Sequence, residues 1–275
     1  MSNNLLAGKK GIIFGALDER SISWAVAKKA HEQGAEFVLT NAPIALRMGT
    51  INQLSEKCGN APVISADATN MEDLEKLVDE SMEKLGGKID FVLHSIGMSP
   101  NVRKKRHYTN LNYDWYHKTM DISAMSFHRV MQTLYQKDAM ADEGSILTLS
   151  YMAAQRTFPD YNDMAEAKAM LESITRSFGY HFGVKNKVRV NSISQSPTMT
   201  TAGSGVGGFD SFFNYADKTS PLGNASANDC ADYCLSMFSD FTKKVTMQNL
   251  MHDGGFSSVG ISADVMGIFA DKEDK

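Results

Sequence analysis

Short runs rich in β-branched and aromatic residues alternate along the whole chain with longer amphipathic stretches. The short runs are nearly continuous in apolar character, which is typical of strands in a parallel sheet that is covered on both faces. Strands and helices that alternate in this way are joined by right-handed crossovers, so the pattern predicts a doubly wound α/β sheet. The seven predicted strands are residues 11–14, 36–40, 62–65, 90–94, 145–149, 188–193 and 247–251.

Helices are predicted between these strands. The clearest one starts after Asn70, whose side chain can cap the first turn, and it ends at Gly86. No linker, repeat or low-complexity tract divides the chain. We therefore predict one Rossmann-type domain over residues 1–275, with a seven-stranded, mostly parallel sheet and helices on both faces. The other predicted helices are residues 21–33, 114–136, 161–182 and 226–238.

Composition restricts the classes of function. Hydrophobic residues make up 43% of the 275 residues and charged residues 22%, which is the balance of a globular protein. The formal net charge of -4 gives no overall attraction to nucleic acid or anionic lipid. Three cysteines are too few for a disulfide framework or a four-ligand zinc site, and no metal site is expected. We see no signal peptide and no apolar run near the ~20 residues that span a bilayer, so we expect a cytoplasmic protein.

The segment after the first strand is a candidate phosphate loop. Gly15 permits a sharp backbone turn, the helix that follows offers free N–H groups at its start, and Ser21 can donate a hydroxyl hydrogen bond. The usual dinucleotide fingerprint has three glycines, whereas Glu19 and Ser21 occupy its second and third positions here. An ordinary strand-to-helix turn therefore stays open as an alternative to a pyrophosphate site.

Tyr161 and Lys168 form a candidate catalytic pair. Both fall in the predicted helix 161–182, where their spacing places them about two turns apart on one face. A tyrosine holds its proton at neutral pH, and a neighbouring ammonium group stabilises a developing phenolate. An isolated tyrosine and lysine at this spacing also fit an interface ring and a solvated charge.

Further short segments follow one another in a recognisable order between residues 7 and 260. Together with the loop from Gly15 to Ile22, this order resembles that of the enoyl-acyl-carrier-protein reductases, a divergent family of short-chain dehydrogenases/reductases. The segments with this resemblance are Asp67, His94-Ser95-Ile96-Gly97, Leu149-Ser150-Tyr151, Pro159-Asp160-Tyr161-Asn162-Asp163-Met164, residues 191–200 and Asp253-Gly254-Gly255-Phe256.

The resemblance implies transfer of hydride from NADH to the C=C bond of trans-2-enoyl thioesters in bacterial fatty acid synthesis, with NADPH not excluded. Tyr161 would donate a hydrogen bond to the thioester oxygen, Lys168 would hold the ribose hydroxyl groups, and Tyr151 would be the third catalytic residue. Tyr151, Tyr161 and Met164 would contact the substrate beside a mobile loop over about residues 198–220. The implied cofactor-binding residues are Gly15, Ser21, Ile22, Asp67, Ala68, Ser95, Ile96, Gly97, Ile122, Lys168, Pro197, Thr198 and Thr200.

The resemblance also implies acyl carrier protein as the partner that delivers the substrate, and a homotetramer as the assembly. The end of the second strand, residues 40–43, has no acid for a ribose 2′-hydroxyl group and no arginine for a 2′-phosphate. Arg47 is near enough to leave NADPH open, although the resemblance favours NADH. The basic run at residues 103–107 is either a solvated loop or, by our hypothesis, the surface that docks the acidic carrier protein.

Three residues in the loop after the sixth predicted strand depart from the family pattern. Gln195 and Ser196 stand where the family has Ala-Gly, and Thr198 stands where it has isoleucine.

Two other functions stay open. A short-chain alcohol dehydrogenase or ketoreductase would act on a C–O bond, but such enzymes have a serine where this chain has Thr148, and they have a glycine-rich loop. A catalytically inactive NAD-binding regulator would fit the three departures, although Tyr161 is present.

Overall fold

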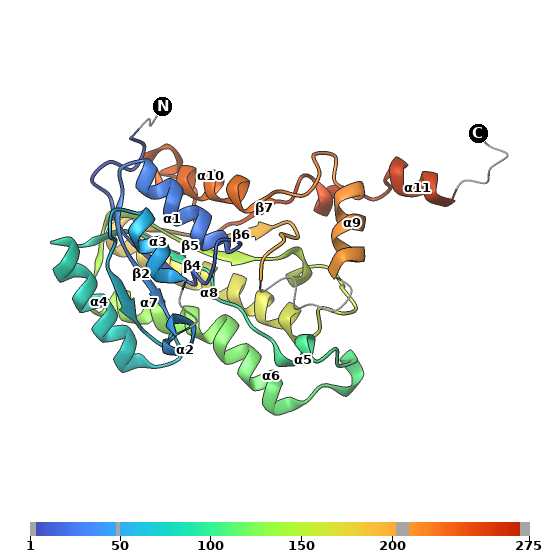
Figure 1. The fold of residues 1–275 in the computed structure, drawn as a ribbon, viewed down its shortest axis with the longest axis horizontal. Helices are drawn as coiled ribbons and strands as arrows, with labels where there is room; N and C mark the ends of the chain where they lie inside the picture. Colours follow the sequence, from blue (N-terminus) through green and yellow to red (C-terminus); the bar gives the residue numbers. More distant parts are fainter. Residues whose placement is uncertain (1–3, 48–49, 202–208, 270–275) are drawn as a thin grey trace.

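The computed structural model describes residues 4–47, 50–201 and 209–269, and its seven strands form one sheet. Figure 1 shows this sheet between layers of helices. Every strand pair is parallel, and the strand order is β3-β2-β1-β4-β5-β6-β7. All seven predicted strands are confirmed, as is the doubly wound fold class. The strands are β1 Lys10–Phe14, β2 Glu36–Asn41, β3 Val63–Ser65, β4 Ile89–His94, β5 Met140–Ser150, β6 Arg189–Gln195 and β7 Asn249–His252.

Alternate residues of the central strands belong to two separate hydrophobic cores. Ile13 and Leu93 point to one core and Ile12 and Val92 to the other, and all four side chains are fully buried. This alternation explains why the strands are apolar throughout, since a sheet with helices on both faces has no solvent-facing side. Helices α1 Ile22–Glu32, α3 Ile51–Lys57 and α10 Ala227–Phe238 contribute to the first core, whereas α4 Met71–Leu85, α7 Ser126–Gln136 and α8 Asp163–Asn186 contribute to the second.

The helix predicted after Asn70 is confirmed at both ends. The Asn70 side chain accepts a hydrogen bond from the backbone N–H of Asp73, and Gly86 ends α4 with a positive φ of 66°. The remaining helices are α2 Pro43–Leu46, α5 Pro100–Arg103, α6 Tyr113–Met120, α9 Phe209–Thr219 and α11 Ala263–Phe269, with π-helical η2 Asp121–Met125 between α6 and α7. The short 3-10 segments are η1 Tyr108–Asn110, η3 Met152–Ala154, η5 Asp240–Thr242 and η6 Phe256–Ser258.

The structure corrects the expected start of the helix that contains Lys168. Tyr161 lies outside α8, because Asn162 has a φ of 45° that interrupts helical geometry before the helix begins at Asp163. Tyr161 is instead part of a turn, in which its backbone N–H donates to the Phe158 carbonyl at 3.1 Å. The prediction that Tyr161 and Lys168 share one helix face was therefore wrong.

The substrate loop predicted over about residues 198–220 is not a loop throughout. Its second half is helix α9, because Phe212 and Ala216 are four residues apart and both pack against a small aromatic core around Tyr151. Residues 202–208 of this segment, which include Gly203, Gly205, Gly207 and Gly208, lie outside the described residues.

The chain reverses its direction of winding between β1 and β4, which are neighbours in the sheet. A doubly wound sheet opens a crevice at such a switch point, at the carboxyl ends of the strands. The segments after these two strands, which begin at Gly15 and Ser95, therefore meet where a dinucleotide is expected. Within the described residues, no helix combines the length and the apolar character needed to cross a bilayer.

Candidate active site

Gly15 is required where β1 meets the predicted phosphate loop. Its φ is +91°, and a Cβ atom on it would lie 2.0 Å from the carbonyl oxygen of Ser95. Any side chain would push the segments after β1 and β4 apart, because that distance is far below van der Waals contact. The absence of a side chain therefore allows the segments after β1 and β4 to lie in contact at the switch point.

Ser21 fixes the shape of the same loop. Its Oγ accepts hydrogen bonds from the backbone N–H groups of Leu17 and Asp18, at 3.1 and 3.0 Å, and donates to the Asp18 carbonyl at 2.7 Å. Helix α1 begins directly afterwards at Ile22, so its unpaired N–H groups and positive dipole end face the crevice. The N–H groups at the start of α1 fit the pyrophosphate of a dinucleotide, even though two glycines of the usual fingerprint are missing. The expected donation from Ser21 differs, because its hydroxyl proton is directed to the Asp18 carbonyl.

The other predicted cofactor residues follow the carboxyl ends of strands, except for Ile122 and Lys168, which lie in helices. Asp67 and Ala68 come after β3, and Asp67 accepts hydrogen bonds from the N–H and the hydroxyl group of Thr69. Ile122 lies in η2. The segment after β4 contains Ser95, Ile96 and Gly97. It lies next to Lys168, since a Cβ atom on Gly97 would be 3.7 Å from Lys168 Nζ.

Lys168 is a buried ammonium group between the segments that contain Gly97 and Leu149. It is 8% exposed, and its Nζ donates a hydrogen bond to the Leu149 carbonyl at 2.7 Å. Burial lowers the pKa of Lys168 to about 8, although the negative charge of Glu172 opposes that shift. Glu172 is itself held by the Ser150 hydroxyl group at 2.7 Å. The lysine is therefore fixed in position, and its protonation changes within a few pH units of neutrality.

Tyr151 and Tyr161 lie in contact, with ring centroids 5.1 Å apart. Tyr161 also packs against Met164, so the structure brings all three predicted substrate-binding residues together. Burial raises the pKa of both phenols, which keeps them protonated and able to donate hydrogen bonds at neutral pH. The Tyr151 hydroxyl group is buried and has no hydrogen-bond partner among the described residues.

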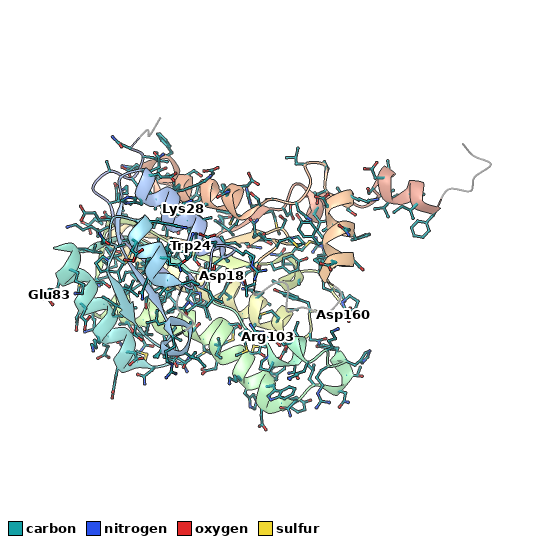
Figure 2. The ribbon with its side chains drawn as sticks, viewed as in Figure 1. Asp18, Trp24, Lys28, Glu83, Arg103 and Asp160 are labelled. Atoms are coloured by element: carbon teal, nitrogen blue, oxygen red, sulfur yellow. The ribbon has the colours of Figure 1, made fainter. Side chains whose placement is uncertain are left out.

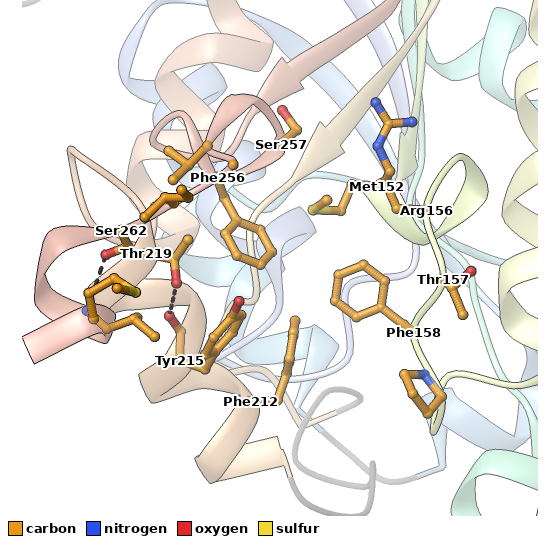
Figure 3. A pocket seen from close by; sticks show the side chains of 16 residues that line it. Met152, Arg156, Thr157, Phe158, Phe212, Tyr215, Thr219, Phe256, Ser257 and Ser262 are labelled. Carbon is orange, nitrogen blue, oxygen red and sulfur yellow. Dashed lines mark hydrogen bonds between the residues drawn. The ribbon is translucent and has the colours of Figure 1, made fainter. Parts of the chain in front are cut away.

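Sequence reasoning missed the aromatic wall beside these tyrosines. Phe158 and Phe212 lie 5.3 and 6.2 Å from the Tyr151 ring, measured between centroids, and Phe256 lies 6.4 Å from Phe158. Figure 3 shows Phe158, Phe212 and Phe256 along one pocket. This pocket has a volume of about 540 Å³. The three phenylalanines come from distant parts of the chain, so no periodicity in the sequence could have grouped them.

The departures at Gln195 and Ser196 form a hydrogen-bonded corner after β6. His252 Nδ1 lies 2.7 Å from Gln195 Oε1, and the Ala225 N–H donates to Ser196 Oγ at 2.7 Å. Thr198 donates to the Ser196 carbonyl at 3.0 Å, next to the buried Pro197. The loop expected to hold the nicotinamide is thus held by hydrogen bonds from its own side chains, and the backbone N–H of Thr200 donates to the Thr198 carbonyl at 2.7 Å.

His94 and Thr148 are fully buried beneath the site. Burial and the nearby charge of Lys168 lower the pKa of His94 to about 3, so its ring is neutral at physiological pH. The Thr148 hydroxyl group donates to the His94 carbonyl at 3.2 Å. Thr148 occupies the position of the substrate-binding serine of carbonyl-reducing relatives, but its hydroxyl group is directed to the backbone. In the described part of the chain, no three His, Cys, Asp or Glu residues gather as a metal site would require.

This doubly wound sheet has a glycine at its switch point, a buried lysine on α8 and two tyrosines in contact. Together these features define a dinucleotide-dependent reductase of the short-chain class. A family model described as enoyl-(acyl carrier protein) reductase matches residues 15–257. The chain belongs to that family.

Individual relatives agree over nearly the whole chain. An enoyl-[acyl-carrier-protein] reductase [NADH] from Rhizobium meliloti is 35% identical over 95% of both chains. The solved FabI–NADH complex from Alistipes finegoldii is 62% identical, with a TM-score of 0.95 over 98% of this chain and 95% of that chain. The Bacillus cereus enoyl-acyl carrier protein reductase, solved with NADP+ and an indole naphthyridinone, is 30% identical, with a TM-score of 0.87 over 94% and 99% of the two chains.

Proposed function

We propose that this protein reduces the C=C bond of trans-2-enoyl thioesters, delivered on acyl carrier protein, with NADH as the reductant. A bound reduced nicotinamide would supply the hydride for the β-carbon of the substrate. The negative charge that then develops on the thioester oxygen must be stabilised by the protein, and this stabilisation is what speeds the reaction.

Tyr161 and Tyr151 are the donors available for that oxygen. Both phenols stay protonated at neutral pH because burial raises their pKa. The unpartnered hydroxyl group of Tyr151 supports a role toward a ligand, since a buried donor without a partner is costly in a folded protein. Lys168 would hold the ribose hydroxyl groups and keep a positive potential next to the developing charge.

The use of the Thr148 hydroxyl group favours C=C over C=O reduction. A ketoreductase needs a hydroxyl group at this position that faces the substrate, whereas here it is buried and donates to His94. This is the single observation on which the choice of reaction rests. The intact Tyr161 and Lys168 argue against the alternative of an inactive NAD-binding regulator.

The choice of NADH rests on the end of β2 and on the relatives. Asn41 donates to the Ala16 carbonyl at 3.1 Å and supports the phosphate loop, and no charged side chain follows it before Arg47. An NADPH enzyme would use a cation there to pair with the 2′-phosphate. Arg47 is exposed, so comparison of kcat/KM for NADH and NADPH in wild type and in Arg47→Ala decides its role.

A turnover assay tests the proposed function directly. Crotonyl thioester should be reduced with consumption of NADH, and acetoacetyl thioester should not be reduced. Reduction of the ketone alone would establish the ketoreductase alternative, and inertness toward both substrates in the presence of bound NADH would establish the regulator. The cytoplasmic location and the homotetramer are part of the same proposal, and size-exclusion chromatography with light scattering tests the tetramer.

A further inference from the structure

Residues 103–107, here named the basic loop, extend from the last residue of α5 to the start of η1. Arg103, Lys104 and Lys105 are exposed, and none of the ion pairs in the described part of the chain involves them. The absence of partners is notable in a chain with 32 acidic and 28 basic residues. The basic loop is thus a local positive surface on a protein of net negative charge.

A fully buried carboxylate holds the start of this surface in place. Asp163, the first residue of α8, accepts hydrogen bonds from Ser99 Oγ at 2.6 Å and from Asn101 Nδ2 at 2.8 Å. Thr119 of α6 donates to the same carboxylate at 2.8 Å. Three separate segments therefore meet at one buried charge, which gives the polypeptide leading into the basic loop a defined position.

The other end of the basic loop is attached to the turn that contains Tyr161. Asn162 Nδ2 donates to the Arg106 carbonyl at 2.7 Å. The Arg106 guanidinium group also lies over the Trp115 ring, 5.7 Å from its centroid. Because Asn162 is the neighbour of Tyr161 in the chain, the basic loop and the candidate catalytic tyrosine are fixed relative to one another.

Aromatic side chains adjoin the charged residues. Tyr108 is 54% exposed and Tyr113 is 74% exposed, and the Tyr108 hydroxyl group donates to Glu166 at 2.6 Å. Exposed tyrosine beside arginine is the composition found at protein–protein interfaces. The basic side chains of residues 103–105 are exposed and line neither the pocket beside Phe256 nor the pocket beside Leu5, so the surface fits a charged macromolecule better than a small anion.

We propose that the basic loop, together with Tyr108 and Tyr113, docks the acidic protein that delivers the enoyl thioester. This inference rests on the proposed function. Opposite charges on the two proteins would steer their encounter, and the fixed connection from Arg106 through Asn162 would place the bound carrier at a set distance from Tyr161.

A charge-reversal pair tests the docking surface. Lys104→Glu/Lys105→Glu should raise KM for crotonyl thioester on an acidic carrier protein by about tenfold, with kcat unchanged, because rim charges act mainly on association. KM for the uncharged crotonyl-pantetheine should not change. The increase should shrink as salt is added, since exposed charges are screened within about 10 Å at 0.1 M.

Lys28→Glu/Lys84→Glu is the matched control. Both lysines are exposed, on α1 and α4, and Figure 2 shows Lys28 well apart from Arg103. The control has the same change in net charge and should leave KM for the carrier substrate unchanged. An equal rise in the control, or an equal rise for crotonyl-pantetheine, would overturn the docking assignment. A rise for crotonyl-CoA without one for the carrier substrate would overturn it too, because the loop would then recognise a nucleotide phosphate.

Wild-type turnover of crotonyl-pantetheine separates this inference from the proposed function. If the wild-type protein reduces no enoyl thioester, the proposed function fails. If it reduces carrier-bound and carrier-free substrates and the Lys104/Lys105 variant behaves like wild type, only the docking surface is refuted.

Discussion

The Thr148 hydroxyl group donates a hydrogen bond of 3.2 Å to the backbone carbonyl of His94, its directly paired neighbour on β4. The bond joins two central strands just below the candidate site. His94 Nδ1 lies 3.3 Å from the same hydroxyl oxygen, and its Nε2 lies 3.0 Å from Ser126 Oγ. This buried network supports the site from below, and none of its members is exposed.

Thr148→Val tests whether this hydroxyl group is structural. The substitution keeps the shape but leaves the His94 ring without one hydrogen-bonding neighbour, so the free energy of unfolding should fall by about 1 kcal/mol. Turnover of crotonyl thioester should stay within about twofold of wild type, because the group does not face the substrate. Denaturant titration and steady-state kinetics measure both. A loss of turnover as large as that expected for Tyr161→Phe would instead place Thr148 in the catalytic machinery.

Lys168 predicts an alkaline limit to activity. Its pKa of about 8 means that the ammonium charge is present below that pH and is lost above it. Because the proposed function uses this charge to hold the ribose and to stabilise the developing oxyanion, kcat/KM should be flat below pH 8 and fall about tenfold per pH unit above it. The two tyrosines should cause no further change of kcat/KM in that pH range, since burial raises their pKa.

Stability should respond to pH in the opposite direction. An unfolded lysine has a pKa near 10.4, so between about pH 8 and that value the unfolded chain binds more protons than the folded one at this position. The free energy of unfolding should therefore rise with pH in that window while activity falls. Lys168→Arg keeps its charge, so the activity that this variant retains should not fall near pH 8. A fall of kcat/KM near pH 8 that persists in this variant would show that another group titrates.

Gly15→Ala should disrupt the cofactor site. The new Cβ would meet the Ser95 carbonyl at 2.0 Å with a φ of +91°, so both contact and backbone strain oppose it. We expect a loss of more than about 1 kcal/mol in stability and a rise in KM for NADH of at least about tenfold. Gly183→Ala is the control, because it lies within α8 with no atom within 4 Å of the added Cβ. This control should be neutral or more stable by up to about 1 kcal/mol, and equal losses in both variants would contradict the argument.

Asp163→Asn should destabilise the protein without touching the substrate. The carboxylate accepts from three side-chain donors, whereas an amide has one acceptor oxygen and must face at least one donor with its own N–H groups. The free energy of unfolding should fall by about 1–3 kcal/mol. Asp160→Asn, at an exposed position three residues earlier, should change it by less than about 0.5 kcal/mol. Chemical denaturation compares the two, and equal stabilities would show that the buried network contributes nothing.

The fold could be predicted because its signals are local. Each strand is a short apolar run, and the helix from Met71 to Leu85 has its capping residue, its periodicity and its terminal glycine within one stretch of sequence. The seven parallel strands follow from that alternation and from the handedness of crossovers.

The site could be predicted only in part, because its geometry depends on contacts between distant segments. The Tyr161 turn depends on Asn162, whose side chain bonds to Arg106, and nothing in the local sequence indicates that the helix starts after it. The partners of Asp163 likewise come from three other positions. Resemblance to a family supplied Tyr151 and Met164, and the structure places both beside Tyr161.

Tyr151→Phe and Tyr161→Phe should separate the two phenols by their effects on stability. The Tyr151 hydroxyl group is buried without a partner, so its removal should leave the free energy of unfolding unchanged or raise it by up to about 1 kcal/mol. Turnover should still fall, because the proposed function has this hydroxyl group donate to the thioester oxygen. Tyr161→Phe should lower kcat by about 10²–10³-fold, as expected when a donor to a developing oxyanion is removed. Full activity in Tyr151→Phe together with lower stability would mean that the phenol serves the fold, and Tyr161 would then be the only donor to the thioester oxygen.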